Sequence, residues 1–511
     1  MFGVASAVNL FHLGRFPRLT MRTPPSYDLS PFGVEHFASA RLGHVCRTQS
    51  LIDQANRLVK HPKGSLPDKL KDPNALRRLY DLMNTKAVTH PAVLSPHVRR
   101  TAGLLLEQTG VVLCIHDTTE IDLTGHTALH PELGQIGDGN GRGYECHNSL
   151  VVLPPARRVL GLLAQQLHCR DFAPQGETPA QRRERDSRES LLWPQGAEAA
   201  RQAVERACRD RRLAGPPAAL QVVDVCDRGG DTFEFLDYEQ DHQRHYVVRS
   251  EHNREIRIGH DPAGAKAKLH DHLRTVPEQS QRTITVRDHD SGKTRFATLA
   301  ISWAAVVLWP PHQQCGFSRR LPLAVWCVRV WEPAAPAGVE AIEWFLLTNV
   351  AVNTVEDAWE RVEWYCTRWV VEEYHKALKT GCDIEGPQFE TAAAMQPMIA
   401  LLSVVALSLL NLRDRSRDPQ LQNRPATEVM SPEEVEVLAG WRYGRRRELT
   451  TREFFLALAR LGGHQNRKRD HPPGWLVLWR GWQALQLLVA GARAARALDA
   501  AKGGENVDPS G

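Results

Sequence analysis

The sequence predicts an α/β fold with helical segments at both ends of the chain. Short apolar runs between residues 111 and 250 have the length of strands, and charged or turn-forming residues bound them. A Trp-rich tract over residues 251–344 contains three further strand-like runs, separated by polar or proline turns. Before about residue 95, and again from residue 355, the apolar residues recur at helical spacing.

The bulk composition is that of an ordinary globular protein. The chain has 511 residues, 42% hydrophobic and 24% charged, which is enough for several domains and at least one sizeable core. Its ten cysteines include no C-x-x-C pair and no Cys/His cluster at zinc spacing, which indicates a reducing compartment and argues against structural zinc. The N-terminus lacks a basic segment ahead of its apolar stretch, and the longest apolar run, residues 398–412, is short for a bilayer span. We therefore expect a cytoplasmic protein with no membrane partner, in which residues 398–412 form a core helix.

The N-terminal part of the chain is basic. Residues 1–30 read as a loose leader and residues 31–100 as a small helical domain. The first 100 residues hold 15 Lys and Arg against six Asp and Glu, a local net charge of +9. This balance suits an anionic partner such as nucleic acid, and a solvated basic surface explains it equally well.

Two of the central strand-like runs end in an acid. The runs are VVLCIHD (111–117), CHNSLVVLP (146–154), RVLGLLAQQLH (158–168), LQVVDVCD (220–227) and HYVVRS (245–250). The second and third are expected to be neighbouring strands of a hairpin or meander. Asp117 and Asp227 stand at the C-terminal ends of their runs, where an acid adds nothing to a core and where functional groups gather in open sheets.

A third carboxylate lies in YCTRWVVEEYHKALKTG (365–381). On one continuous helix at 100° per residue, Tyr365, Arg368, Glu372 and Lys379 fall within about 60° of one another, opposite an apolar face. On an isolated helix this pattern is usually a solvated face with i,i+4 ion pairs. Helical periodicity is expected to continue from residue 355 to the core helix.

Asp117 and Asp227 change the balance between these interpretations. Together with Glu372 they would supply three carboxylates from two strand ends and one helix. Hard cations prefer oxygen ligands, and two of them about 4 Å apart hold both the attacking and the leaving oxygen of a phosphoryl displacement. The sequence therefore predicts a site for two Mg²⁺ or Mn²⁺ ions.

The spacing Tyr365-x2-Arg368-x3-Glu372-x6-Lys379 resembles the Y-R-E-K signature of bacterial insertion-sequence DDE transposases. This is the transposon-five type of the insertion-sequence-four family. HDTTEIDLTGH and VCDRGGDTFEFL are similar to the two aspartate segments of that family. YVVRS, EWFLLTN and, more loosely, the basic N-terminal segment also agree, so that the resemblance covers roughly residues 31–490.

The resemblance implies a ribonuclease-H-like catalytic core interrupted by a β-rich insertion. The expected division is 1–30 leader, 31–100 helical DNA-binding domain, 101–250 first part of the core, 251–344 insertion, 345–415 second part of the core, and 416–511 helical region for dimerisation and synapsis. The implied activity is cut-and-paste transposition by two-metal phosphoryl transfer, with end cleavage, a hairpin intermediate and strand transfer. The implied partners are double-stranded DNA at the terminal inverted repeats, target DNA, and a second copy of the chain in a synaptic homodimer, with the protein on the nucleoid when bound.

The resemblance also assigns roles to single residues. Asp117, Asp227 and Glu372 would be the catalytic metal ligands. Candidates for contacts with DNA are Tyr365, Arg368, Lys379, Trp344, Arg249, Arg41, Arg47, Lys60 and Lys63. Trp344 matches the aromatic side chain that receives a flipped base, and an ordinary core tryptophan on a strand explains it about as well. An ordinary exposed arginine explains Arg249 nearly as well as a strand-end arginine near DNA.

Several neighbouring residues are expected to have other roles. Asp122 and Asp231 are predicted to lie in turns or at the surface, because neither follows an evident strand, and Asp224 is not assigned to the site. The two glycines of DRGGD are expected to loosen the start of the following helix. Three tryptophans of the C-terminal tail share one helical stripe, which is either a local core or part of the synaptic surface: Trp475, Trp479 and Trp482.

Two alternatives to transposition remain open at this point. A metal-dependent nuclease would cut DNA without joining it, and would not need Tyr365 and Lys379 as a set. A non-catalytic inhibitor of transposition would bind the DNA ends while its core stayed idle.

Overall fold

The protein divides into two units. The computed structural model describes residues 8–9, 32–154, 156–172, 176–178, 181, 185, 187–287, 294–311, 321–467, 470 and 472–504. One unit comprises residues 1–18 and 98–373, and the other comprises residues 19–97 and 374–511. The leader expected over residues 1–30 lies outside the described residues, except for Val8–Asn9.

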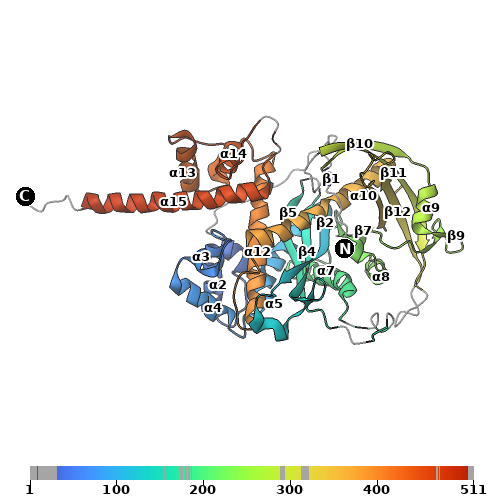
Figure 1. Cartoon of the computed structure of the whole chain (residues 1–511), viewed down its shortest axis with the longest axis horizontal. Helices are drawn as coiled ribbons and strands as arrows, with labels where there is room; N and C mark the ends of the chain where they lie inside the picture. The colour runs from blue at the N-terminus through green and yellow to red at the C-terminus, as the bar shows by residue number, and fades with distance from the viewer. Residues whose placement is uncertain are drawn as a thin grey trace, which may run out of the picture. The chain divides into compact units, whose positions relative to one another are not determined.

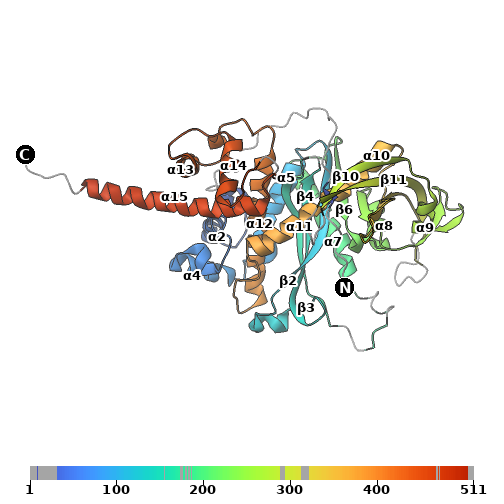
Figure 2. The ribbon, with the colours of Figure 1, turned by 45° about the horizontal axis from the view of Figure 1, so that its top comes forward.

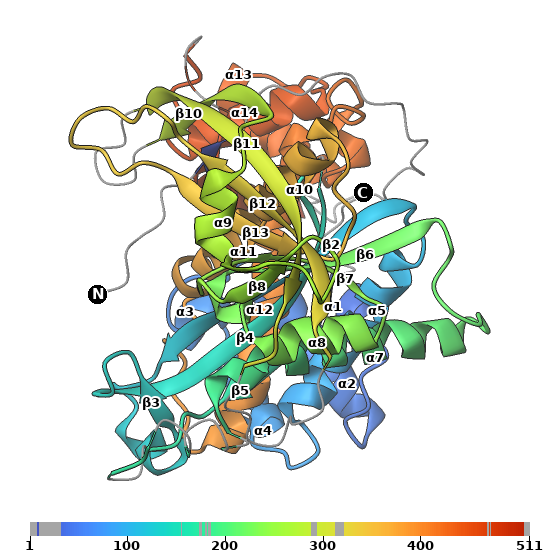
Figure 3. The ribbon, with the colours of Figure 1, turned by 90° about the vertical axis from the view of Figure 1, so that its right-hand side faces the viewer.

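The first unit is built on a mixed sheet of 13 strands, which confirms the α/β class (Figure 3). Its strands are β1 (Val8–Asn9), β2 (Gly110–Asp122), β3 (Gly134–Ile136), β4 (Gly141–Leu153), β5 (Arg158–His168), β6 (Leu220–Cys226), β7 (His245–Arg249), β8 (Glu255–Ile258), β9 (Lys266–Lys268), β10 (Ser280–Arg287), β11 (Thr294–Leu308), β12 (Leu323–Trp331) and β13 (Glu343–Thr348). Neighbouring strands follow the order β1-β10-β11-β12-β13-β7-β6-β2-β4-β3, while β5 pairs with β4, and β8 pairs with β11 and β9.

Five of these strands form a continuous segment in the order β5-β4-β2-β6-β7. The pairs β4–β5 and β2–β4 are antiparallel, whereas β2–β6 and β6–β7 are parallel. The predicted pairing of residues 146–154 with 158–168 is confirmed. The strands of residues 251–344 continue the same sheet, because β13 pairs with β7 and connects it to β12, β11 and β10.

Helices cover the sheet of this unit. They are α7 (Leu192–Asp210), α8 (Phe233–Asp241), α9 (Leu269–Thr275) and α10 (Val355–Thr367). α7 and α8 run next to each other along the sheet (Figure 3). A row of alanines on α7, including Ala200, Ala203 and Ala207, packs with Val112 and Val151 of the strands, because small side chains allow a close approach.

The second unit is helical in its described part. Its helices are α1 (Phe32–Phe37), α2 (Val45–Leu58), α3 (Leu66–Leu70), α4 (Pro73–Met83), α12 (Ala392–Arg417), α13 (Pro432–Tyr443), α14 (Thr451–Leu461) and α15 (Trp475–Gly504). α5 (His90–Leu105) and α11 (Trp369–Lys376) cross from one unit to the other. α13 and α14 lie beside α15 (Figures 1 and 2), and α14 approaches it most closely where Gly462 faces Gly481.

The apolar run of residues 398–412 lies within α12. This helix is long and apolar enough, by composition, to cross a membrane, and 89% of its most apolar window is buried inside the protein. The prediction of a core helix is therefore confirmed. Trp475, Trp479 and Trp482 are also buried, so the interpretation of their stripe as a local core is confirmed.

The expected helical continuity from residue 355 to the core helix is wrong. A π-helical turn covers Ala377–Gly381, and residues 382–391 are not helical before α12 begins. Thr391 is the N-cap of α12, and its side chain accepts a hydrogen bond from the backbone of Ala394. Gly386 and Pro387 occupy the intervening loop, where both residue types disfavour a helix.

Candidate functional site

Asp117 lies inside a strand and not at its end, contrary to the prediction. The parallel pairing of β2 with β6 stops at His116 and Cys226. β2 then continues to Asp122 as one arm of the antiparallel pair with β4. Asp117 is thus the first residue beyond the parallel pairing, as Asp227 is the first residue after β6. Both aspartates therefore emerge at the same level of the sheet.

The two aspartates are held differently. Asp227 is half-buried and is the N-cap of a short 3₁₀ turn, where its carboxylate accepts a hydrogen bond of 2.9 Å from the backbone of Gly229. Asp117 is only 7% exposed and accepts a hydrogen bond of 2.8 Å from the backbone of Thr118. Burial raises the pKa of Asp117 to about 8, and the negative charges of Asp227 and Glu372 act in the same direction.

α11 brings Glu372 to this pair. An oxygen of Glu372 lies within 4.8 Å of an oxygen of Asp117. Arg368 connects the two carboxylates, because its guanidinium donates to Asp117 Oδ2 and lies 3.4 Å from Glu372 Oε1. The guanidinium lowers the pKa of Asp117, although not enough to offset its burial. The three predicted ligands thus form one electrostatically coupled group with a single arginine among them.

Aromatic and basic side chains border the group. The ring of Tyr365 is buried and meets the ring of Trp344 edge-to-face, with centroids 5.4 Å apart. The guanidinium of Arg249 lies 5.6 Å from the centre of the Trp344 ring. Burial raises the pKa of Tyr365, while Arg368 and Arg249 oppose the rise. Trp344 itself is 8% exposed in β13, the position expected of a core tryptophan.

The assumption of one regular helix over residues 365–379 is wrong at two points. At Arg368 the backbone tightens, since hydrogen bonds join residues three apart where α10 meets α11. The Thr367 hydroxyl donates to the carbonyl of Glu363, a contact that bends helices. The π-helical turn then changes the angle per residue before Lys379, whose ammonium lies 3.4 Å from Glu385. The 100° spacing therefore does not place Lys379 in the stripe.

The N-terminal basic candidates lie in the second unit. Arg41 and Lys63 are exposed, and Lys60 is half-buried. Arg47 donates a hydrogen bond of 3.0 Å to the carbonyl of Leu42, so that it closes a local turn. Sequence reasoning missed a fully buried basic residue in this unit, Lys69, whose ammonium donates a hydrogen bond of 2.7 Å to the carbonyl of Cys382. Burial lowers the pKa of Lys69.

Asp231 is buried, contrary to the expected turn or surface position. Its carboxylate accepts hydrogen bonds from the Ser250 hydroxyl and from the backbone of Glu251 and His252, at 2.7–3.2 Å. It also pairs with Arg254. Asp231 therefore organises the segment that follows Arg249 at the end of β7. Asp122 accepts a hydrogen bond from the backbone of Thr124, which places it at a turn as expected. It is also the last residue of β2, so the expectation that no strand ends there is wrong.

The glycines of DRGGD are sites of close packing, and they do not loosen the next helix. A Cβ atom on Gly229 would lie 2.2 Å from the indole of Trp193, and one on Gly230 would lie 2.5 Å from the side chain of Cys226. α8 begins regularly, since the Thr232 side chain accepts a hydrogen bond from the backbone of Phe235. The expected loosening of the start of this helix is therefore wrong.

The Gly229→Ala substitution is expected to lower the free energy of unfolding by about 1–3 kcal/mol, because the new methyl group must displace Trp193. Gly125→Ala is a matched control, since nothing lies within 4 Å of a Cβ built there. The measurement is urea denaturation of both variants beside the wild type. Equal midpoints for the two variants would show that Trp193 moves away at no cost.

A scan of the chain against models of protein families gives no match. The nine cysteines in the described part of the chain are all free thiols.

Proposed function

We propose that the protein is a DDE transposase that cuts and joins DNA by metal-dependent phosphoryl transfer. The observation that carries the proposal is the group formed by Asp117, Asp227 and Glu372 around Arg368. Asp117 and Glu372 come from distant parts of the chain and approach within 4.8 Å, and the charge of Asp227 raises the pKa of Asp117 as well. A stable core has no need of such a group of acids. A buried carboxylate with a raised pKa, such as Asp117, is typical of functional sites.

The fold of the first unit supports a ribonuclease-H-like core. The strands β5-β4-β2 form an antiparallel meander, which β6 and β7 extend in parallel. The order in which the three acids occur along the chain also supports the proposal. Asp117 lies on β2, Asp227 follows β6, and Glu372 lies on the later helix α11.

The donor set fits hard divalent cations. Asp117, Asp227 and Glu372 offer oxygen ligands, and the oxygens of Asp117 and Glu372 are within 4.8 Å of each other. Two oxygen ligands of one octahedral Mg²⁺ ion lie at most about 4.2 Å apart, so the separation of these oxygens is close to what one ion would need. When bound, a pair of such ions would activate the attacking oxygen and stabilise the charge on the leaving oxygen.

The basic and aromatic residues beside the acids are proposed to hold the DNA. The guanidinium groups of Arg368 and Arg249 suit phosphate oxygens, and the phenol of Tyr365 can donate a hydrogen bond to another phosphate oxygen. Such contacts position the scissile bond without reading the sequence. Recognition of the inverted repeats is assigned to the basic helical segment with Arg41 and Lys63, and a second copy of the chain would complete the synaptic complex.

A cleavage and joining assay tests the proposal. The full chain is incubated with a DNA fragment that carries both flanks of its reading frame, with Mg²⁺ or with EDTA. We expect cuts at the element ends and joined products with Mg²⁺ only. Glu372→Gln should retain end binding and lose cleavage by about 10³-fold or more, equivalent to about 4 kcal/mol of transition-state stabilisation. Glu373→Gln is the matched control and should cleave within a few-fold of the wild type.

The other outcomes identify the alternatives. Cleavage without joined products would indicate a nuclease. End binding without cleavage by the wild type would indicate an inhibitor of transposition, and equal cleavage by the wild type and Glu372→Gln would refute the assigned site.

A further inference from the structure

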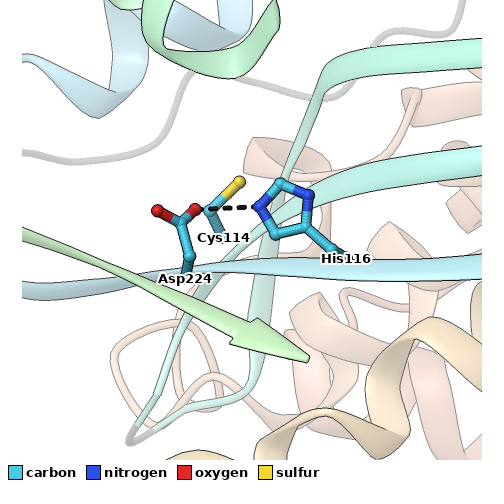
Figure 4. Close-up of side chains that lie close together, drawn as sticks. All are labelled: Cys114, His116 and Asp224. Atoms are coloured by element: carbon cyan, nitrogen blue, oxygen red, sulfur yellow. Dashed lines mark hydrogen bonds and ion pairs between the residues drawn. The ribbon is translucent and has the colours of Figure 1, made fainter. Parts of the chain in front are cut away.

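Three buried polar side chains of β2 and β6 form a cluster next to Asp117. It consists of Cys114 and His116 on β2 and Asp224 on β6 (Figure 4). His116 and Asp224 are fully buried, and Nε2 of His116 lies 2.8 Å from Oδ1 of Asp224. Consecutive side chains of a strand point to opposite faces, so His116 and Asp117 face opposite sides of the sheet.

The cluster has the composition of a metal site, but its polar atoms already have partners. Arg244 pairs with Oδ2 of Asp224, and its Nε–H donates a hydrogen bond of 2.9 Å. Nδ1 of His116 lies 3.0 Å from the hydroxyl of Ser149. A guanidinium thus supplies the positive charge that a cation would bring. The arrangement is that of a hydrogen-bonded link between strands.

The link lies where the backbone stops joining the two aspartate strands. The parallel pairing of β2 and β6 ends at His116 and Cys226, one residue before Asp117 and Asp227. By contrast, β2 remains paired with β4 for six residues beyond His116. The bond from His116 to Asp224 therefore reinforces the last three residue pairs between β2 and β6, after which no backbone pairing joins these strands. The bond to Ser149 reinforces the pairing of β2 with β4, which continues past Asp117 without it.

Tight packing holds the His116 ring in this position. The ring stacks on His147 with centroids 5.9 Å apart and meets Phe235 edge-to-face. α7 passes so close that a Cβ atom on Gly196 would lie 2.6 Å from His147 and 3.2 Å from Nδ1 of His116. The ring consequently has little freedom to release Asp224 and take another partner.

We propose that His116 is a positioning residue, which through Asp224 sets the distance between the carboxylates of Asp117 and Asp227 and thereby the affinity for divalent cations. The inference rests on the proposed function, because it takes these aspartates as ligands. Removal of a hydrogen bond that orients metal ligands typically lowers metal affinity by about 10- to 100-fold.

Two substitutions of His116 distinguish its hydrogen bond to Asp224 from its hydrogen bond to Ser149. The amide nitrogen of glutamine reaches about as far as Nε2 of histidine, and that of asparagine only as far as Nδ1. His116→Gln can therefore keep the bond to Asp224, while His116→Asn loses it. We expect the Mn²⁺ affinity of His116→Asn to be about 10- to 100-fold below that of the wild type, and His116→Gln to restore it to within about threefold. Ser149→Ala, which removes the other bond, should also stay within about threefold of the wild type.

The measurement is Mn²⁺ binding by electron paramagnetic resonance, with circular dichroism melting and DNA-end binding as controls on folding. If His116→Asn does not fold, Asp224→Glu takes its place, because it keeps the charge and displaces the carboxylate by one methylene. Equal Mn²⁺ affinity in the wild type, His116→Asn and Ser149→Ala would overturn the inference. The inference would also be overturned if the wild type held one zinc ion per chain and the Cys114→Ser variant held none. If the wild type shows no Mn²⁺ binding that Asp117→Asn removes, the proposed function fails instead.

Discussion

Replacing Arg368 by glutamine is expected to strengthen Mn²⁺ binding by the DNA-free protein about tenfold, and to slow DNA-end cleavage about 100-fold or more. The two effects have opposite signs because Arg368 has one partner in the free protein and is proposed to have another in the complex with DNA. In the free protein its guanidinium pairs with Asp117 and lies beside Glu372. In the complex with DNA it is proposed to bind a phosphate.

Electrostatics gives the sign of the first effect. At an effective dielectric constant of about 20, a divalent cation about 4 Å from a guanidinium is repelled by several kcal/mol. A cation that binds Asp117 must therefore displace Arg368, and its removal lowers that cost. DNA would do the same in the wild type by attracting the guanidinium to a phosphate, so the site would bind its cations most tightly when DNA is present.

The pH of the experiment matters because a proton competes for the same carboxylate. The pKa of Asp117 is raised to about 8, so below pH 8 a cation must displace a proton, and its affinity rises with pH up to that value. Arg368→Gln removes a charge that lowers this pKa, so the rise extends to higher pH in the variant. The comparison is made by Mn²⁺ titration at pH 8.5–9, where the proton competes least.

Arg249→Gln is the matched control for Arg368→Gln. It removes the same charge from the same region, but the guanidinium of Arg249 lies over the ring of Trp344. We expect its Mn²⁺ affinity to stay within about threefold of the wild type, while DNA binding weakens. If Arg368→Gln binds Mn²⁺ no more tightly than the wild type, Arg368 does not compete with cations for Asp117.

Most residues of the candidate site could be predicted from the sequence, because the strand or helix that carries each of them sets the direction of its side chain. Asp227 follows its strand, Tyr365 and Arg368 end one helix, and Glu372 lies in the first turn of the next. Spacing alone fixes the side on which such residues emerge, within a turn or two. The ion pair between Arg368 and Asp117 was not predictable in this way, since it joins residues 251 positions apart.

The errors share a physical cause. The polar residues after Asp117 suggested the end of a strand, but pairing with β4, which begins at Gly141, keeps β2 extended through Asp122. Asp231 follows a glycine turn and has the local pattern of a surface residue. It is buried because the segment after β7 folds over it and donates three hydrogen bonds to one of its oxygens. In both cases a distant part of the chain decides the outcome.

The buried acids Glu239 and Asp224 predict a large effect of pH on the free energy of unfolding. Glu239 on α8 is fully buried, and Nε of Arg244 lies 3.5 Å from its carboxyl. Burial raises the pKa of Glu239 well above its usual range, and the charge of Asp224 adds to the rise. Burial opposes ionisation of Asp224 as well, but Arg244 and His116 hold its pKa below the usual range. Ionisation is therefore disfavoured at Glu239 and favoured at Asp224, whose negative charge Arg244 balances.

The sign of the pH dependence follows from Glu239. In the unfolded chain its carboxyl loses the proton above about pH 4.5, whereas in the folded protein burial holds its pKa well above that value, so the proton is kept to a higher pH. The folded state thus binds more protons, and the contribution of Glu239 to the free energy of unfolding falls as the pH rises. The slope is at most about 1.4 kcal/mol per pH unit, from about pH 4.5 up to the folded pKa.

Glu239→Gln is expected to remove this slope, because the amide is neutral in both states. Above about pH 4.5 and up to the folded pKa, the variant should gain stability relative to the wild type as the pH rises, by at most about 1.4 kcal/mol per pH unit. The measurement is urea denaturation at pH 6, 7 and 8. Glu234→Gln on the same helix is the control, because Glu234 is part-exposed and pairs with Arg188 at 3.2 Å. Parallel curves for the wild type and Glu239→Gln would mean that the buried pair holds no extra proton, and that the charge of Arg244 is balanced in some other way.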